Sequence, residues 1–396
     1  MRLVHLSDLH LGYRQYQRLT PGGINQREAD VAATFRASID QIIELAPDVV
    51  IVAGDIFHTV RPTNQAILHG FIQFARLAEA LPNTEVLLLA GNHDTPRSSE
   101  TGGILQLFTQ LGLHVVDREP KRLRFAGGRL SILAVPGVPG LSRPALTPDP
   151  DAEFNVLVMH GPVEGMPSES VMPADRATNE ILRSEIGASR WDYVALGEYH
   201  VYAEVEPNVF YSGSIDYTSA NLWLKLYEAN KIGVREKGFI ERDLATGAHK
   251  FHPLPPSRPV IDLPAISARG LTVAEIDEKI RSAVESVRGG IDDKIIRLMI
   301  RDLPRHIGRE LDHKAIRDYK RRALNFHLDL RRPDTLRLHA AGSPGRRPSL
   351  NEIVREKLMA RPLDADVDRV VLVERAMTYL DEAQLVAQAP PMLLDA

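Results

Sequence analysis

Side chains that can ligate a cation recur along the first half of the sequence, each time directly after a short apolar run. The set comprises Asp8, His10, Asp55, Asn92, His160 and His200. Carboxylate, imidazole and amide groups are ligands that suit manganese, iron or zinc. Two such cations roughly 3.5–4 Å apart stabilise both the attacking and the leaving oxygen of a phosphoryl displacement. Each cluster alone is weak support, because an Asp-x-His sequence is common by chance. Their joint occurrence predicts a site for two metal ions.

Short aliphatic runs precede these polar residues and must position them. Such runs, rich in β-branched residues and bounded by glycine or proline, are typical of buried strands. They cover residues 3–6, 49–53, 86–90, 156–159 and 193–196. Each polar cluster therefore follows the carboxyl end of a strand, where open α/β sheets bind their ligands. Apolar residues at helical spacing over 29–45 and 67–77 predict helices between the strands. Together these patterns predict an α/β fold for residues 1–255.

The composition is that of an ordinary globular chain, and it restricts the chemistry. The 396 residues are 44% hydrophobic and 25% charged, which fits two or three domains. The absence of cysteine excludes disulfides, cysteine-ligated zinc and thiol catalysis. No run of 18 apolar residues occurs, so we expect no membrane span. The first residues lack the apolar stretch of a signal peptide, and we expect a cytoplasmic protein.

Charge is distributed unevenly along the chain. The formal net charge is −4, which argues mildly against nucleic-acid binding. Between Lys314 and Arg347, however, ten Lys or Arg stand against three Asp. A local basic stripe can contact phosphates even when the whole chain is slightly acidic. A solvated basic face is the alternative interpretation of this stretch.

Two breaks divide the chain after the first α/β region. A proline-rich stretch over residues 253–259 has the composition of a linker. Beyond it the pattern predicts a strand at 295–300, a helix at 309–323 and a strand at 324–330. We assign residues 256–340 to a small α+β domain. A glycine- and proline-rich break then precedes a helical tail at residues 345–396, whose short amphipathic helices pack on this chain or bind a partner helix.

Five motifs resemble the successive motifs of calcineurin-like metallophosphoesterases. They are Asp8-x-His10, Gly54-Asp55, Gly91-Asn92-His93-Asp94, His160-Gly161 and Gly197-x-x-His200. A narrower resemblance, over about residues 1–335, is to the SbcD family of nuclease subunits, which pair with coiled-coil ATPases in DNA double-strand-break repair. This narrower resemblance rests on His58, on Asn25-x-Arg27-x-x-Asp30 and on the Phe-Tyr-Ser-Gly-Ser sequence at residues 210–214.

The resemblance implies a four-layer αββα sandwich that holds two divalent metal ions. Mn²⁺ is preferred over Mg²⁺, Fe or Zn. The two implied ligand sets share Asp55, which would bridge the metals. One metal would be held by Asp8, His10, Asp55 and His200, and the other by Asp55, Asn92, His160 and the residue at position 198.

The same resemblance implies catalytic roles for three further residues. His93 would stabilise the transition state or protonate the leaving oxygen. Asp94 would orient His93 through a hydrogen bond. His58 would contact the substrate phosphate or nucleotide, and a surface loop histidine is the alternative interpretation.

The last motif departs from the family pattern at one position. Glu198 stands where the first histidine of a Gly-His-x-His motif is expected. Glutamate is itself an oxygen ligand for manganese or magnesium, so the second site would remain complete with one more negative charge. The alternative is that Glu198 points away and leaves this site weak.

The function implied by the resemblance is a metal-dependent DNA exo- and endonuclease of double-strand-break repair. Residues 256–340 would then cap the DNA, and residues 345–396 would bind an SbcC-type coiled-coil ATPase. The chain would form a homodimer. Two alternatives remain open. One is a phosphoesterase acting on small molecules or proteins, and the other is a DNA-binding or scaffolding subunit that lost turnover through Glu198.

Overall fold

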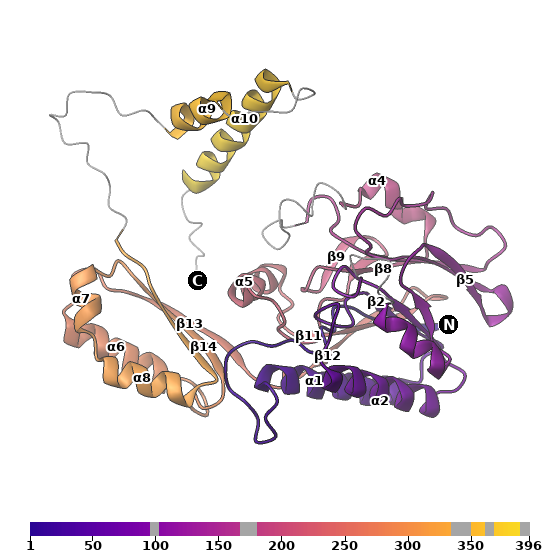
Figure 1. The fold of residues 1–396 in the computed structure, drawn as a ribbon, viewed down its shortest axis with the longest axis horizontal. Coiled ribbons are helices and arrows are strands. Elements are labelled where there is room, and N and C mark those ends of the chain that lie inside the picture. The colour runs from indigo at the N-terminus through magenta and orange to yellow at the C-terminus, as the bar shows by residue number, and fades with distance from the viewer. Residues whose placement is uncertain (96–102, 167–179, 334–349, 361–367, 389–396) are drawn as a thin grey trace. The chain divides into compact units, whose positions relative to one another are not determined.

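The computed structural model describes residues 1–95, 103–166, 180–333, 350–360 and 368–388. The chain divides into two compact units, Met1–Pro333 and Asp334–Ala396. The first unit contains three β-sheets (Figure 1). We call residues 1–254, which hold the first two sheets, the large subdomain. We call residues 260–330, which hold the third sheet, the small subdomain.

The first sheet of the large subdomain is mixed and has the strand order β12-β11-β1-β2-β3-β4. The strands β1 to β4 are parallel, whereas β11 and β12 pair antiparallel at one side. The bounds are β1 Arg2–Leu6, β2 Val49–Ala53, β3 Glu85–Leu89, β4 His114–Val116, β11 Lys237–Asp243 and β12 His249–Leu254. The strands predicted at 3–6, 49–53 and 86–90 are therefore present within one residue at either end.

The second sheet has the order β5-β6-β7-β8-β10-β9, with parallel central strands and antiparallel edges. The bounds are β5 Lys121–Phe125, β6 Leu130–Val135, β7 Phe154–His160, β8 Tyr193–Gly197, β9 Ala203–Glu206 and β10 Val209–Tyr211. The parallel strands β6, β7 and β8 are buried along their whole lengths, which explains their continuous apolar sequences.

Successive side chains of a strand point to opposite faces, and this alternation builds two cores around the first sheet. Leu3, Ile51 and Leu87 face the second sheet and form a shared core with it. The intervening residues of the same strands pack instead against α1 (Gln26–Leu45) and α2 (Asn64–Ala80). Figure 1 shows these two helices along the outer face of the first sheet. The 3-10 helix η1 (Ile104–Leu111) joins this layer.

Among the described residues, short helical elements cover the outer face of the second sheet. They are α4 (Arg183–Ile186), the 3-10 helix η4 (Ala188–Arg190) and part of α5 (Leu222–Ile232), whose Ala229 joins this core. The 3-10 turn η2 (Ala126–Gly128) connects β5 to β6. The expected α/β class with two packed sheets is confirmed.

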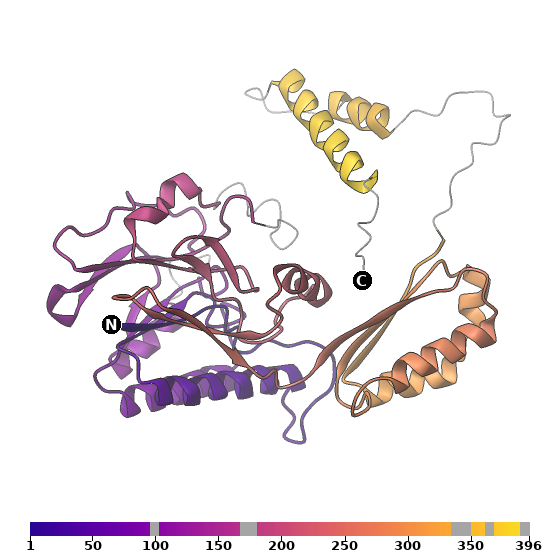
Figure 2. The same ribbon diagram turned by 180° about the vertical axis from the view of Figure 1, so that it is seen from behind.

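The small subdomain has a parallel sheet of β13 (Val260–Ser267), β14 (Ile295–Arg301) and β15 (Asn325–Leu330). Helices α6 (Val273–Glu285), α7 (Arg305–Glu310) and α8 (His313–Arg322) belong to it, and Figure 2 shows them along the sheet. The single helix predicted at 309–323 is wrong, because two helices occupy this region. The Asp312 carboxylate accepts from the backbone N–H groups of Lys314 and Ala315, so it starts a new helix.

The second unit contains α9 (Leu350–Ala360) and α10 (Arg369–Gln388). The Arg369 guanidinium donates to the carbonyl oxygens of Leu358 and Met359, which ties the start of α10 to the end of α9. Residues 334–349, which include part of the predicted basic stretch, lie outside the described residues. Among the described helices, none combines the length and the apolar character needed to cross a bilayer.

Candidate metal centre

The predicted metal-binding residues follow five strands that belong to two facing sheets. Asp8 follows β1, Asp55 follows β2, and Gly91 to Asp94 follow β3 of the first sheet. His160 ends β7, and Glu198 follows β8 of the second sheet. Because these strands are parallel within each sheet, their carboxyl ends meet at one edge. Packing of the two sheets brings both sets of side chains to the same place.

The backbone of this site adopts a rare conformation at several positions. Asp8, His10, Asp55 and Glu198 have φ values of 53°, 47°, 53° and 109°. Such positive φ angles are uncommon outside glycine, and they concentrate at functional sites. The Asp8 N–H donates to the Gly54 carbonyl at 3.0 Å, and the His10 N–H donates to the Asp55 carbonyl at 2.9 Å. These bonds hold the loops after β1 and β2 side by side.

The first group of possible ligands consists of Asp8, His10 and His200. The Nε2 atoms of His10 and His200 lie 3.0 Å apart. His200 Nε2 is also 3.8 Å from Asp8 Oδ1, and His10 Nε2 is 3.6 Å from Asp55 Oδ2. Two imidazole nitrogens and the Asp8 carboxylate therefore converge as ligands of a cation do, with an Asp55 oxygen close to His10.

The second group lies on the other side of Asp55. His160 Nε2 is 3.5 Å from Asp55 Oδ1 and 3.2 Å from Glu198 Oε2. Asp55 thus directs one carboxylate oxygen to His10 and the other to His160. This is the arrangement expected of a carboxylate that bridges two cations.

Hydrogen bonds around the two groups fix the orientation of the donors. His160 Nδ1 donates to the Ala53 carbonyl at 2.9 Å, which leaves Nε2 to face the carboxylates. His160 Nε2 lies 3.5 Å from Asp55 Oδ1 and 3.2 Å from Glu198 Oε2. Ser7 Oγ donates to Asp8 Oδ2 at 2.6 Å. An imidazole nitrogen held toward buried carboxylates in this way fits a metal ligand.

Burial disfavours the charged forms of these carboxylates and imidazoles. Burial raises the pKa of Asp55 to about 8, although His160 and His93 act in the opposite direction. Burial also raises the pKa of Asp8. Burial lowers the pKa of His200, and the charge of Lys237 adds to this effect. Divalent cations would offset this cost because they pair with the buried carboxylates. The donor set therefore fits two metal ions.

Glu198 faces the cluster and does not point away from it. Its carboxylate contacts His160, and its backbone N–H lies 3.1 and 3.2 Å from the two carboxylate oxygens of Asp8. Burial raises the pKa of Glu198, but the hydrogen bond and charge of His160 outweigh burial and lower it overall. An ionised carboxylate therefore occupies the position where the family pattern has a histidine.

The loop after β3 contacts Asp55 through its backbone. A Cβ atom at Gly91 would overlap with Asp55 Oδ1, so only glycine fits there. The His93 N–H donates to Asp55 Oδ1 at 3.0 Å. Asn92 lies between these two contacts with an exposed side chain. Its role as a ligand remains a prediction.

The role expected of Asp94 needs correction. Its two carboxylate oxygens accept from the backbone N–H groups of Ile56, Phe57 and Gly91 at 2.8–3.1 Å. The His93 ring is oriented instead by its Nδ1, which donates to the His58 carbonyl at 2.7 Å. Asp94 therefore joins the loops after β2 and β3. It shapes the site through backbone bonds and does not orient His93 directly.

His58 lies over the first group of ligands. Its Nδ1 is 3.3 Å from His10 Nδ1, and its ring stacks on His93 with centroids 5.3 Å apart. Tyr13 packs edge-on against the other side of the His58 ring. His58 is therefore part of the site and not a free surface histidine. Its contact with substrate remains a prediction.

Two residues that the sequence reasoning missed also support the site. Lys237 of β11 is buried, and its Nζ donates to the His200 carbonyl at 2.5 Å and to Ser214 Oγ at 3.0 Å. Burial lowers the pKa of Lys237 to about 7, and Lys225 acts in the same direction. Ser7 stands next to Asp8 in the sequence and could have been found from that position. Lys237 has no motif around it, so only the fold reveals its role.

The family model of calcineurin-like phosphoesterases matches residues 1–202, slightly more than half of the chain. The chain therefore belongs to this family, and the resemblance seen in the five motifs is confirmed. The matched region contains β1, β2, β3, β7 and β8, which position the site, and all ten predicted site residues.

Several curated proteins similar to this chain carry the name DNA double-strand break repair protein Mre11. The one from Methanopyrus kandleri is 28% identical over 223 residues, which cover 52% of this chain and 46% of that protein. The one from Methanosarcina mazei is 26% identical over 365 residues, which cover 80% of this chain and 55% of that protein. A shorter match, to the protein from Methanococcus maripaludis, reaches 40% identity over 102 residues, which cover 26% of this chain and 25% of that protein. The chain thus spans about half the length, or less, of these relatives.

Proposed function

We propose that this protein is a two-metal phosphodiesterase that cleaves DNA in the repair of double-strand breaks. The observation that carries the proposal is the position of Asp55, whose two carboxylate oxygens face His10 on one side and His160 on the other. The names of the similar Mre11 proteins support DNA as the substrate. The family membership supports phosphoester hydrolysis.

The proposed ligands form two sets around Asp55. Asp8, His10 and His200 would hold one cation with Asp55, and His160, Glu198 and Asn92 would hold the other. When bound, the two cations would polarise the phosphate and activate water at neutral pH. Mn²⁺ is the proposed ion, because the set combines carboxylates with imidazoles and lacks thiolates.

His93 is the proposed proton donor to the leaving oxygen. Its Nδ1 hydrogen is held by the His58 carbonyl, so Nε2 is the ring atom free to exchange a proton with substrate. Its backbone contact with Asp55 keeps the ring beside the proposed cations. His58 stacks on the same ring, and we propose that it contacts the substrate phosphate or nucleotide.

The small subdomain supplies a basic surface suited to a nucleic-acid backbone. Lys314, Arg317, Lys320 and Arg321 of α8 have exposed side chains. Basic side chains of this kind neutralise phosphates and make binding sensitive to salt. We propose that this surface belongs to the DNA-capping region expected at residues 256–340.

A nuclease assay on DNA with defined ends tests the proposal. Wild-type protein should cleave duplex DNA with Mn²⁺, less with Mg²⁺ and not with EDTA. His93→Ala should lower kcat by about 100-fold or more while metal content stays unchanged. Hydrolysis of small phosphodiesters without DNA cleavage would instead favour a small-molecule phosphoesterase. Binding of two Mn²⁺ ions without any turnover would favour a scaffolding subunit.

We further propose that the helical tail binds a coiled-coil ATPase. Val371 and Tyr379 of α10, which lie on the same side of the helix about two turns apart, are 50% and 70% exposed. Such a surface suits a partner helix. A chain cut at residue 342 should fail to retain an SbcC-type ATPase in a pull-down, whereas the full chain retains it. Equal retention by both would contradict the proposal.

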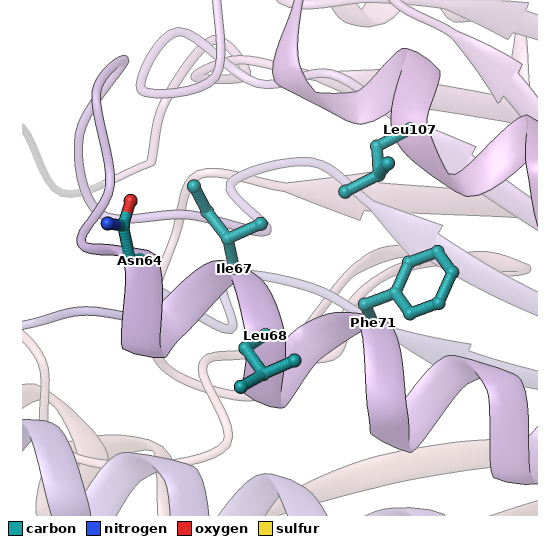
Figure 3. Close-up of a pocket in the computed structure, with 5 residues that line it drawn as sticks. All are labelled: Asn64, Ile67, Leu68, Phe71 and Leu107. Carbon is teal, nitrogen blue, oxygen red and sulfur yellow. The ribbon is translucent and has the colours of Figure 1, made fainter.

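A homodimer is proposed through α2 and η1. Ile67, Leu68 and Phe71 of α2 and Leu107 of η1 line an apolar pocket with Asn64 at its end (Figure 3). Leu68 is 60% exposed, so this face is open in one chain. Light scattering should give twice the chain mass for the wild type and the monomer mass for Leu68→Glu. A monomeric wild type would contradict the proposal.

A further inference from the structure

A fully buried arginine lies between the metal centre and the small subdomain. The Arg27 side chain is 1% exposed and donates to Asp30 Oδ2 at 3.0 Å, to Asp216 Oδ1 at 3.0 Å and to the Tyr217 carbonyl at 2.9 Å. The planar guanidinium has fixed donor directions, so it sets the positions of both carboxylates. Arg27 therefore links α1 to the segment after β10.

The same Asp30 also binds the segment that leads into the small subdomain. Arg258 Nε donates to Asp30 Oδ2 at 2.7 Å, and Arg258 also donates to the Asp293 carbonyl at 3.0 Å. Asp293 lies two residues before the start of β14, and Arg258 lies two residues before the start of β13. One carboxylate of the large subdomain thus receives an arginine from each side.

A second arginine reaches the small subdomain from the loop before α1. Arg18 donates to Asp293 Oδ1 at 2.6 Å and to the carbonyl oxygens of Arg321 and Ala323 at 2.6 and 3.1 Å. The loop that carries it is closed by a bridge between Leu19 and Asn25. Arg18 and Arg258 therefore meet at Asp293 from two different segments.

The inner end of this network reaches a proposed metal ligand. Ser214 Oγ donates to the Asp216 carbonyl at 2.7 Å, and the Ser214 N–H donates to the His200 carbonyl at 3.2 Å. Lys237 binds both the His200 carbonyl and Ser214 Oγ. A continuous set of hydrogen bonds therefore runs from His200 to the backbone of the small subdomain.

One apolar cluster also joins the two subdomains. Its buried members are Leu222, Ile295 and Leu324, and Tyr16, Tyr217, Trp223 and Val260 pack around them partly buried. Apolar contact is non-directional, whereas arginine–carboxylate pairs fix an angle as well as a distance. The arginine contacts therefore supply directional restraints between the subdomains that the apolar cluster does not.

We propose that Arg18, Arg27 and Arg258 form a joint that holds the small subdomain at a fixed orientation to the metal centre. They are positioning residues, and none of them is proposed to touch the scissile phosphate. The consequence for cleavage rests on the function proposed above: a DNA duplex that spans both subdomains needs this orientation, and a small phosphodiester does not.

A distance measurement tests the joint without reference to activity. The chain has no cysteine, so spin labels can be placed at exposed sites through Glu44→Cys in α1 and Glu285→Cys in α6. Pulsed electron–electron double resonance on the full-length protein should give a narrow distribution of distances between the two labels. Arg18→Met and Arg258→Met should each broaden it. Arg124→Met breaks a bidentate pair with Asp149 inside the large subdomain and should leave it unchanged. A distribution that stays narrow in both joint variants would overturn the proposal.

Kinetics on two substrates then test the consequence. Arg258→Met should lower kcat/KM on duplex DNA at least tenfold and change hydrolysis of bis-p-nitrophenyl phosphate less than twofold. Arg258→Lys, which keeps one charged donor, should recover part of the loss on DNA. An equal loss on both substrates would show a general structural defect and overturn the positioning role. Wild type that cleaves neither substrate would contradict the proposed function, and the distance measurement would still decide the joint.

Discussion

The carboxylate of Glu198 lies 3.2 Å from Nε2 of His160, at the position where the family pattern has a histidine. A hard oxygen ligand at this position favours manganese or magnesium over zinc. We expect the added negative charge to strengthen the binding of hard cations such as Mn²⁺ by the second group. We therefore expect Glu198 to shift the metal preference of the second group while the site still binds a cation.

Glu198→His should shift metal preference from Mn²⁺ toward Zn²⁺. We expect Mn²⁺ affinity at the second site to fall by about tenfold and Zn²⁺ affinity to rise, because a neutral nitrogen ligand replaces an anionic oxygen. Isothermal titration calorimetry with Mn²⁺ and with Zn²⁺ measures both changes in affinity. An unchanged ratio of the two affinities would rule out this account of Glu198.

Asp94→Ala should destabilise the fold by about 3 kcal/mol, because three buried backbone N–H groups lose their acceptor. Asp94→Asn keeps one carbonyl oxygen and should cost about half as much. Urea denaturation measures both variants. If Asp94 acted on His93 directly, activity would fall in Asp94→Asn with no loss of stability, and that result would contradict the corrected role.

Gly91→Ala should abolish binding of the cations that share Asp55 while the protein stays folded. The added Cβ would overlap with Asp55 Oδ1 and lie 2.6 Å from the Asp55 backbone nitrogen, so Asp55 must move. Gly22→Ala is a suitable control, because its Cβ would meet only Thr20 Oγ1 at 3.8 Å. Metal content after dialysis against Mn²⁺ distinguishes the two variants. Full occupancy in Gly91→Ala would show that this glycine is not needed.

His5 should make the stability of the protein depend on pH below neutrality. Burial lowers the pKa of His5 to about 3, from about 6.5 in the unfolded chain, although a hydrogen bond with the Leu196 backbone acts in the opposite direction. Between these two values the unfolded state binds more protons than the folded state, so stability falls as pH falls. At pH 5 the loss is about 2 kcal/mol relative to pH 7.

His5→Gln should remove this part of the pH dependence, because glutamine does not titrate and can still bond to the Tyr193 hydroxyl that His5 Nδ1 contacts at 3.0 Å. The drop in unfolding free energy from pH 7 to pH 5 should therefore be about 2 kcal/mol smaller in the variant than in the wild type. Other histidines contribute equally to both proteins. Parallel pH profiles would show that His5 is protonated in the folded state.

The positions of the strands and of most site residues could be predicted because the information is local. Val49–Ala53 is a continuous apolar run followed by Gly54 and Asp55, and such a run forms a buried strand wherever it packs. Parallel pairing then places the following carboxylates at one edge of the sheet. Asp8, Asp55 and His160 accordingly lie in one cluster.

The contacts of Asp94 and Lys237 could not be predicted, because their partners are set by packing. Two of the N–H groups that bind Asp94 lie 37 and 38 residues away, and the carbonyl that binds Lys237 also lies 37 residues away. The break between α7 and α8 was missed for a different reason. Apolar spacing continues through Leu311, and only the side chain of Asp312 interrupts the helix.

The central claim is that one carboxylate, Asp55, is shared by two cations. Electron paramagnetic resonance of protein loaded with Mn²⁺ tests it most directly, together with the metal content of each chain. We predict two Mn²⁺ ions per chain with the signal of a spin-coupled pair, and loss of the coupling in Asp55→Asn. A single ion, or two ions whose signals are uncoupled in the wild type, would contradict the account.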